Sequence, residues 1–397
     1  MIVIFYIFAA ILIGLSIRSL LGGFEYLRFF REKLEDKQSM FEPLVTLIAP
    51  CKGLDPGLEH NLEALFRQEY SQYEIVFVVE DEKDLSTGVV RNVIGHNRSV
   101  NAILIVAPKA TRSSQKISNL LEAVKHAHPA SQAFVFVDSD ARPSENWLRS
   151  LVAPLGKDEV GAATGYRWFI SDSQSVPAEI RSSWNASIAS ALGPNTSSNF
   201  CWGGSMAIRR STFEALNIGE KWSGALSDDF VVTRAVKDAE LKIEFVPAAL
   251  TASIENCTFA EMLEFTTRQM KITRVYSPHL WLLSWFGSGL FCSVMVAAAF
   301  IAASASGFLF IAAAATIAVI SACSIGKAWL RLRAVELVLV RYESELRSQR
   351  KWQLSLWLFT PFIFLYNCVA AAISRRLKWR GITYELKSPG ETVIIAD

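Results

Sequence analysis

Two aspartates one residue apart, Asp138 and Asp140, directly follow a run of five apolar residues at 133–137. Such a run predicts a strand buried on both faces, as in a parallel sheet. Residues i and i+2 of an extended chain project to the same side, so both carboxylates can point in one direction at the end of this strand. Open α/β sheets bind their ligands at that end. Two hard oxygen ligands suit Mg²⁺ or Mn²⁺ holding substrate phosphates, although an Asp-x-Asp pair alone also fits a solvated turn.

Other charged residues follow the neighbouring predicted strands or begin the helices between them. Lys52 comes after an apolar run at 44–49, Asp81 after a second run at 74–79, and Lys116 lies at the start of a helix predicted over 114–127. Strands alternating with helices predict an α/β domain with a mostly parallel sheet, whose carboxyl ends meet at one edge. The convergence of Lys52, Asp81, Asp138 and Asp140 at this edge predicts a nucleotide site. Alternatively, Asp81 belongs to a solvated acidic loop and Lys116 to an exposed helix face.

A second set of charged residues lies further along the chain. Asp228 and Asp229 begin a predicted helix, and adjacent residues point different ways, so at most one of them faces a given substrate. Arg268 and Lys271 stand three residues apart on a helix predicted over 258–275, and therefore share a face. Two cations on one face suit a diphosphate. Because two tryptophans follow at once, an interfacial basic stripe beside a membrane is the alternative.

Long apolar stretches at both ends of the chain predict membrane segments. Residues 1–17 carry no charge, and Arg18 and further basic residues follow them, which places the downstream domain in the cytoplasm by the positive-inside rule. Residues 280–325 also carry no charge and are long enough for two spans. The predicted parts are an anchor (1–27), an α/β domain (40–278), a transmembrane hairpin (279–326), an amphipathic cytoplasmic helix (327–351), and an apolar membrane segment with a basic tail (352–397).

The topology of the last apolar segment is left open by the sequence. After an N-terminal anchor and a two-span hairpin, a third full crossing over 352–373 would put the basic residues at 375–380 outside, against the positive-inside rule. Either this segment is re-entrant or interfacial, or one of the earlier spans is misassigned.

Composition narrows the class of protein. The 397 residues carry a net charge of +2, which does not favour a nucleic-acid partner, and 51% of them are hydrophobic. The six cysteines show no C-x-x-C spacing, so neither a zinc site nor a disulfide framework is predicted. The sequence predicts an integral, multi-pass membrane protein.

Taken in order, these motifs resemble the membrane-bound, inverting glycosyltransferases with the GT-A fold, a Rossmann-like, mostly parallel sheet. The closest likeness is to the ceramide glucosyltransferase-like branch, which includes bacterial enzymes acting on lipids. The matching stretches are Lys52-Gly53-Leu54-Asp55-Pro56, Asp81, Lys116-Ile117-Ser118-Asn119-Leu120, Asp138-Ser139-Asp140, Ser227-Asp228-Asp229, Arg268-Gln269-Met270-Lys271-Ile272, and Lys378-Trp379-Arg380-Gly381-Ile382-Thr383-Tyr384.

The resemblance implies a function and a set of roles. The donor would be a UDP-sugar and the acceptor a hydroxyl of a membrane lipid, with inversion at the transferred hexose, by family likeness glucose. Asp138 and Asp140 would hold Mg²⁺ or Mn²⁺, and Asp229 would act as the base. The resemblance also implies that the donor is bound by Lys52, Asp81, Lys116, Arg268 and Lys271. Of these, Asp81 would hold the nucleoside. In a bacterium, the protein would lie in the inner membrane.

One departure from the family pattern bears on function. Lys271 and Ile272 stand where the family has Arg and Trp, so the charge is kept but the planar fork and the aromatic platform are lost. A non-catalytic membrane protein that retains the fold is therefore one alternative. A processive polysaccharide synthase is another, which would need more spans for a chain-conducting pore.

Overall fold

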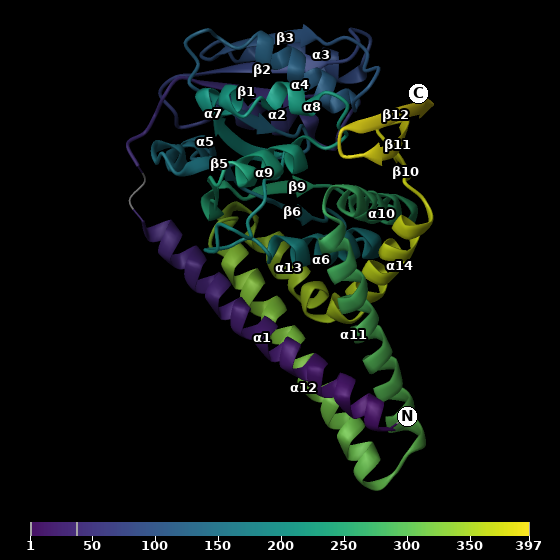
Figure 1. The fold of residues 1–397 in the computed structure, drawn as a ribbon. Coiled ribbons are helices and arrows are strands. Elements are labelled where there is room, and N and C mark those ends of the chain that lie inside the picture. The colour runs from purple at the N-terminus through teal and green to yellow at the C-terminus, as the bar shows by residue number, and fades with distance from the viewer. Residues whose placement is uncertain (1, 37–38, 397) are drawn as a thin grey trace. The chain divides into compact units, whose positions relative to one another are not determined.

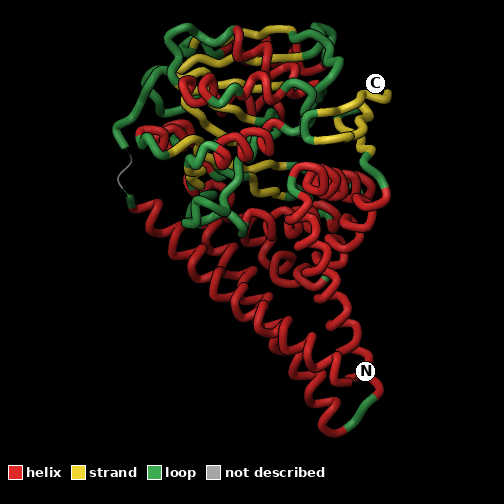
Figure 2. The backbone as a smooth tube through the Cα atoms, viewed as in Figure 1, coloured by secondary structure: helices red, strands yellow, loops and turns green. Residues whose placement is uncertain are grey.

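The computed structural model describes residues 2–36 and 39–396, which form two compact units built from interleaved parts of the chain. The first, here called the helical unit, comprises Met1–Arg31, Ser171–Ser190 and Asn256–Ser374. The second, the sheet unit, comprises Glu32–Ile170, Ala191–Glu255 and Arg375–Asp397. Figure 2 shows strands in the sheet unit and long helices in the helical unit.

The sheet unit is built on a seven-stranded sheet in the order β3-β2-β1-β4-β7-β5-β8. Strands β3, β2, β1 and β4 are mutually parallel, and β7 is antiparallel to both β4 and β5. The predicted α/β class with a mostly parallel sheet is thus confirmed. Its strands are β1 (Val45–Pro50), β2 (Tyr73–Val79), β3 (Asn101–Val106), β4 (Ala133–Val137), β5 (Val160–Thr164), β7 (Ser205–Arg209) and β8 (Lys242–Phe245).

Apolar strands covered by helices form the core of this unit. β4 and β5 are buried along their whole length, as a strand covered on both faces must be. Ile117, Leu120 and Ala123 on one face of α4 pack into the same apolar cluster as Phe134 and Phe136 of β4. The helices of this unit, labelled where there is room in Figure 1, are α2 (Leu58–Phe66), α3 (Leu85–His96), α4 (Gln115–Lys125), α5 (Trp147–Val152), α7 (Arg210–Ala215), α8 (Ile218–Trp222) and α9 (Asp228–Asp238).

Two small sheets complete the sheet unit. β6 (Arg167–Ile170) pairs in parallel with β9 (Thr251–Ile254). The C-terminal residues form a three-stranded antiparallel sheet of β10 (Arg376–Trp379), β11 (Ile382–Ser388) and β12 (Glu391–Ala396). The basic stretch that the sequence placed in a tail is therefore folded structure.

The helical unit contains three helices that are long and apolar enough to cross a membrane, α1, α11 and α12. Large apolar side chains on the last two face outward, with Phe286, Phe300 and Phe308 more than 70% exposed, as on a surface covered by lipid acyl chains. The helices are α1 (Ile2–Glu35), α6 (Val176–Ala189), α10 (Phe259–Tyr276), α11 (Pro278–Ser304), α12 (Gly307–Glu336), α13 (Glu343–Ser355) and α14 (Thr360–Ile373).

The remaining apolar segment does not form a straight span. Residues Val340–Leu358 and Thr360–Ile373 are bent by 60° at the break between them, and α14 has 14 residues, too few for a crossing of roughly 20 residues. The chain after α14 returns to the sheet unit, where Arg380 pairs with Asp55. α11 and α12 are each long and apolar enough to cross a membrane, whereas α14 alone is too short.

Candidate active site

The predicted strand ends gather at one edge of the seven-stranded sheet. Val137, the last residue of β4, pairs with Ser205, the first residue of antiparallel β7. The chain entering β7 therefore lies beside the chain leaving β4, and Gly204 faces Asp138. A Cβ atom on Gly204 would lie 2.7 Å from Oδ2 of Asp138, so only glycine allows the carboxylate this close to the backbone.

Ser139, the residue between Asp138 and Asp140, is fixed by two hydrogen bonds. Its hydroxyl donates to Oδ2 of Asp55 at 2.6 Å, and its carbonyl accepts a hydrogen bond from Nδ2 of Asn61 at 3.0 Å. These contacts tie the middle residue of the Asp-Ser-Asp stretch to the segment after β1 and to α2. Asp138 and Asp140 then both contact the guanidinium of Arg167, as expected for residues i and i+2.

Lys116 joins two acids that are far apart in the sequence. Its Nζ lies 2.8 Å from Oδ1 of Asp138 and 3.2 Å from Oδ1 of Asp228. Burial lowers the pKa of Lys116, but the two carboxylates outweigh this effect and raise it. Burial raises the pKa of Asp138, and the cations of Lys116 and Arg167 outweigh it and lower it. Lys116 and Asp138 are therefore charged together at neutral pH.

Asp228 is buried at the first turn of α9, with 3% of the residue exposed. Burial raises its pKa to about 6, with Asp229 and Asp138 adding to the rise and Lys116 opposing it. Its Oδ2 atom is buried and accepts no hydrogen bond from a described residue. A Cβ atom on Gly203 would lie 2.1 Å from that atom, which makes Gly203 a second glycine required by a carboxylate.

Asp229 points differently from Asp228, as expected for adjacent residues. Its Oδ1 accepts hydrogen bonds from the hydroxyl of Ser227 and from the backbone N–H of Phe230, the latter at 2.7 Å, and its Oδ2 accepts from the N–H of Gly203 at 3.4 Å. These contacts fix the orientation of the Asp229 carboxylate at the first turn of α9. Asp229 is only half-buried, so one face remains open to a ligand.

Arg167 is a site residue that the sequence analysis missed. It follows β5, which lies two strands from β4, and its Nη1 donates to Oδ2 of Asp140 at 2.8 Å while its Nη2 lies 3.7 Å from Oδ2 of Asp138. Its guanidinium also lies 4.8 Å from the ring centroid of Trp202. Burial lowers the pKa of Arg167, and Asp140 and Asp138 outweigh it and raise it. A lone arginine after a short strand gave no signal in the sequence.

Arg380 was also missed as a site residue, although it belongs to a stretch with family resemblance. It lies with Gly381 in the two-residue turn between β10 and β11, and both have positive φ, 50° and 89°. This geometry is that of a type I′ turn, which arginine rarely occupies. Its Nη2 lies 2.5 Å from Oδ1 of buried Asp55, and this ion pair offsets the strained backbone.

Lys52 and Asp81 follow β1 and β2 but do not contact each other. Lys52 pairs with Glu80, the residue before Asp81, and Oε2 of Glu80 is buried without a hydrogen-bond partner among the described residues. Asp81 is exposed, and its Oδ1 accepts from the N–H of Lys83 at 2.9 Å. The predicted contact of Asp81 with a nucleoside stays a prediction.

Arg268 and Lys271 lie on α10 and belong to the helical unit, whereas the acids belong to the sheet unit. Both are half-buried, and the guanidinium of Arg268 lies 5.4 Å from the ring centroid of Phe265 on the same helix. Burial lowers the pKa of Lys271. Their predicted contact with a diphosphate stays a prediction.

The fold and the site together define a class of protein. The sheet is that of a GT-A glycosyltransferase, and it matches the solved mannosyltransferase PcManGT from Pyrobaculum calidifontis, in complex with GDP-Man and Mn²⁺, with a TM-score of 0.52. That match covers 92% of this chain and 98% of the other at 18% identity. The chain belongs to glycosyltransferase family 21, whose model matches residues 6–392.

Curated relatives share part of this sequence. A ceramide glucosyltransferase of Candida albicans is 30% identical over 132 residues, which are 30% of this chain and 24% of that protein. Ceramide glucosyltransferase 1 of Caenorhabditis elegans is 29% identical over 85 residues, 21% of this chain and 18% of that protein. The chain thus matches about a fifth to a quarter of the length of these relatives.

The predicted divalent metal can be tested against the acids of the site. Among the residues that the structure describes, no group of three or more His, Cys, Asp or Glu forms a ready-made metal cage. However, Oδ1 of Asp140 is buried and accepts no hydrogen bond from any of them. Mg²⁺ typically takes one or two carboxylates and completes its coordination with water and substrate phosphates. Asp138 and Asp140 therefore fit a metal ion that binds together with a nucleotide diphosphate.

Proposed function

We propose that this protein transfers a hexose, glucose by likeness to the ceramide glucosyltransferases, from a UDP-sugar to a hydroxyl of a membrane lipid with inversion. The observation that carries the proposal is the meeting of Asp138, Asp140 and Asp228 with Lys116 and Arg167 at the carboxyl edge of the sheet. Family membership and the apolar helices agree with it.

Asp229 is the proposed general base. It lies at the N-terminus of α9 beside the acid cluster, with one face open and the other fixed by Ser227, Phe230 and Gly203. In that position it would take the proton from the acceptor hydroxyl as the hydroxyl oxygen attacks the anomeric carbon. General base catalysis of this kind typically contributes about 10²–10⁴-fold. A single in-line attack without a covalent sugar intermediate gives inversion.

The donor would bind along the same edge. Asp138 and Asp140 would hold Mg²⁺ or Mn²⁺ on the diphosphate, and Asp81 would hold the nucleoside, with Lys52 on the neighbouring strand end. The metal, when bound, supplies positive charge that stabilises the leaving nucleotide. Lys116 keeps Asp138 ionised and oriented. By likeness to the family, Arg268 and Lys271 would add positive charge to the departing diphosphate.

The membrane helices account for a lipid acceptor. α1, α11 and α12 would anchor the protein as a multi-pass integral membrane protein, in a bacterium in the inner membrane. The basic residues that follow the first apolar stretch support a cytoplasmic sheet unit by the positive-inside rule. There a nucleotide-sugar is available, and the acceptor hydroxyl lies at the bilayer surface.

An assay with the full chain in detergent tests the proposal. The protein is supplied with UDP-glucose, Mn²⁺ and a panel of lipids that includes ceramide and diacylglycerol, and the glycolipid product is measured by mass spectrometry. Asp229→Asn should abolish transfer while leaving the fold and donor binding intact. Asp238→Asn is the matched control, because Asp238 lies exposed on the same helix, 69% accessible, and pairs only loosely with Arg234.

The results separate the alternatives. Wild-type turnover in Asp229→Asn would remove Asp229 as the base, and a long polymeric product would show a processive synthase instead. Chelation of the metal should stop transfer, and added Mn²⁺ should restore it. Absence of both transfer and metal-dependent hydrolysis of the donor across the nucleotide-sugars would point to a non-catalytic protein.

A further inference from the structure

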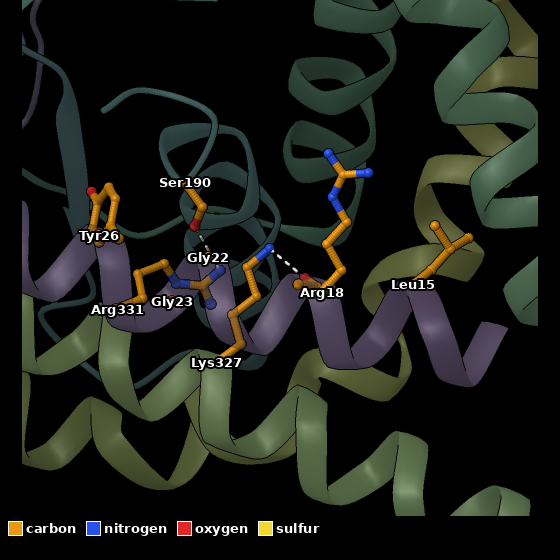
Figure 3. Close-up of a pocket in the computed structure, with 9 residues that line it drawn as sticks. Leu15, Arg18, Gly22, Gly23, Tyr26, Ser190, Lys327 and Arg331 are labelled. Atoms are coloured by element: carbon orange, nitrogen blue, oxygen red, sulfur yellow. Dashed lines mark hydrogen bonds between the residues drawn. The ribbon is translucent and has the colours of Figure 1, made fainter. Parts of the chain in front are cut away.

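A cavity in the helical unit gathers positive charge without an acid. It has a volume of about 310 Å³ and lies between α1 and α12, closed on one side by Ser190 at the end of α6 (Figure 3). Of the described residues that line it, Arg18, Lys327 and Arg331 are cationic and none is acidic. Three like charges around one space favour an anionic ligand there.

The cavity lies where the apolar parts of two helices end together. Arg18 is the first charged residue of α1, and Lys327 is the first charged residue after the uncharged stretch 280–325. The two helices are in close contact at this level: a Cβ on Gly326 would lie 2.9 Å from Cδ1 of Leu20, and Nζ of Lys327 donates to Oγ of Ser19 at 2.8 Å. In a bilayer this level corresponds to the boundary where lipid phosphates lie.

Arg331, the most buried of the three cations that line this cavity, has neutral hydrogen-bond partners. Arg331 is 7% exposed, and its guanidinium reaches Oγ of Ser190 at 3.5 Å and Oε1 of Gln353 at 3.3 Å. Its Nε is buried and has no hydrogen-bond partner among the described residues. A buried charge without a counter-charge is costly, and a planar guanidinium matches phosphate oxygens well. Arg333, two residues further on α12, does have an acid, Glu336 at 2.7 Å.

An apolar cavity adjoins the cationic one. It has a volume of about 590 Å³ and shares four lining residues with the first cavity, Leu15, Ser19, Lys327 and Arg331. The rest of its wall includes apolar side chains of α1, α11 and the α13–α14 region, such as Leu12, Phe291 and Phe364. A charged compartment beside an apolar one fits an amphiphile, with a phosphate at one end and an acyl chain at the other.

We propose that this pair of cavities is a binding site for an anionic phospholipid, with the lipid phosphate held by Arg18, Lys327 and Arg331 and an acyl chain in the apolar compartment. The site lies wholly within the helical unit, whereas the acids of the proposed sugar-transfer site belong to the sheet unit. Its ligand differs from the neutral hydroxyl acceptor, because three cations with no acid among the described lining residues select for negative charge.

The test uses the full chain purified in detergent, with binding measured by native mass spectrometry and by the unfolding midpoint. Three probes separate the sources of the ligand: dioleoyl phosphatidylglycerol, dioleoylglycerol with the same chains but no phosphate, and inorganic phosphate. Phosphatidylglycerol should bind and raise the midpoint, dioleoylglycerol should bind at least tenfold more weakly, and inorganic phosphate should fail to match phosphatidylglycerol at millimolar concentration.

Variants assign the binding to this cavity. Lys327→Gln combined with Arg331→Gln should weaken phosphatidylglycerol binding at least tenfold, and Lys327→Arg should retain it. Arg333→Gln removes the same charge from an exposed site on the same helix and should change nothing. If the double variant does not fold, Arg18→Gln tests the same site. Arg18 is exposed, so this variant should fold, and it should weaken phosphatidylglycerol binding severalfold.

Three outcomes would overturn the proposal. Equal binding of phosphatidylglycerol and dioleoylglycerol would show that the phosphate is not recognised. Unchanged phosphatidylglycerol binding in the folded cation variants would place the lipid elsewhere. Binding of inorganic phosphate alone, lost in the same variants, would keep the anion site and remove the lipid from it.

Discussion

Replacing Lys116 by methionine should destabilise the sheet unit strongly. The ammonium lies 2.8 Å from a carboxylate oxygen of Asp138 and 3.2 Å from one of Asp228, and all three side chains are largely buried. At an effective dielectric constant of about 20, each contact at about 3 Å corresponds to an attraction on the order of 5 kcal/mol. Desolvation offsets much of this, and removing one partner of a buried pair costs about 3–5 kcal/mol. Arg167, 3.7 Å from Asp138, compensates for part of the loss, so we expect a cost near 3 kcal/mol.

A second substitution identifies the cause of that loss. Asp228→Asn removes one of the two carboxylates that Lys116→Met leaves without its cation, so the double variant should recover part of the lost stability. The measurement is the unfolding midpoint in detergent, followed by tryptophan fluorescence. Lys125→Met is the matched control, since Lys125 lies on the same helix, is 68% exposed and pairs only with Glu122. A Lys116→Met variant as stable as Lys125→Met, or a double variant less stable than the single one, would refute the reasoning.

Three further predictions follow from the structure. Gly203→Ala would place a Cβ atom 2.1 Å from Oδ2 of Asp228 and should reduce glycosyl transfer at least tenfold, whereas Gly95→Ala, whose Cβ meets nothing within 4 Å, should leave transfer unchanged in the same assay. Burial raises the pKa of Glu179 to about 7, so its contribution to stability is present below its ordinary pKa of 4.5 and is lost as the pH rises through 7. Glu179→Gln should remove this decline, about 2–3 kcal/mol, from unfolding midpoints measured between pH 5 and pH 8. Arg380→Gln leaves its buried carboxylate partner unpaired and should cost about 1–2 kcal/mol, reduced by the 40% exposure of the arginine, while Arg380→Lys should lose less in the same unfolding measurement.

The residues that the sequence could place are those fixed by local pattern. A five-residue apolar run followed by Asp138 and Asp140 predicts both the strand and the shared direction of the acids, and Arg167 contacts both of them in the structure. Here the periodicity of one element determines where the side chains point. Lys116 is identified only by the resemblance of Lys116-Ile117-Ser118-Asn119-Leu120 to a family motif, because helical periodicity alone also fits an exposed lysine.

The residues that the sequence could not place depend on contacts between distant segments. Arg167 reaches the aspartates only because β5 lies two strands from β4 in the sheet. The periodicity of a single segment does not predict the order of strands. Arg380 reaches Asp55 only because the C-terminal strands fold onto the sheet unit. The same limit applies to Asp228, which turns inward because Lys116 offers a cation there, a contact between residues more than a hundred positions apart.

The ion pair between Arg380 and Asp55 has a consequence for biogenesis. The segment that carries Arg380 leaves the ribosome after α11 and α12 have been synthesised. The sheet unit therefore remains incomplete until β10 and β11 have been synthesised, and Asp55 lacks its cationic partner until then. A nascent chain stalled before Arg375 would already contain every carboxylate of the acid cluster, yet it would lack the arginine that pairs with Asp55.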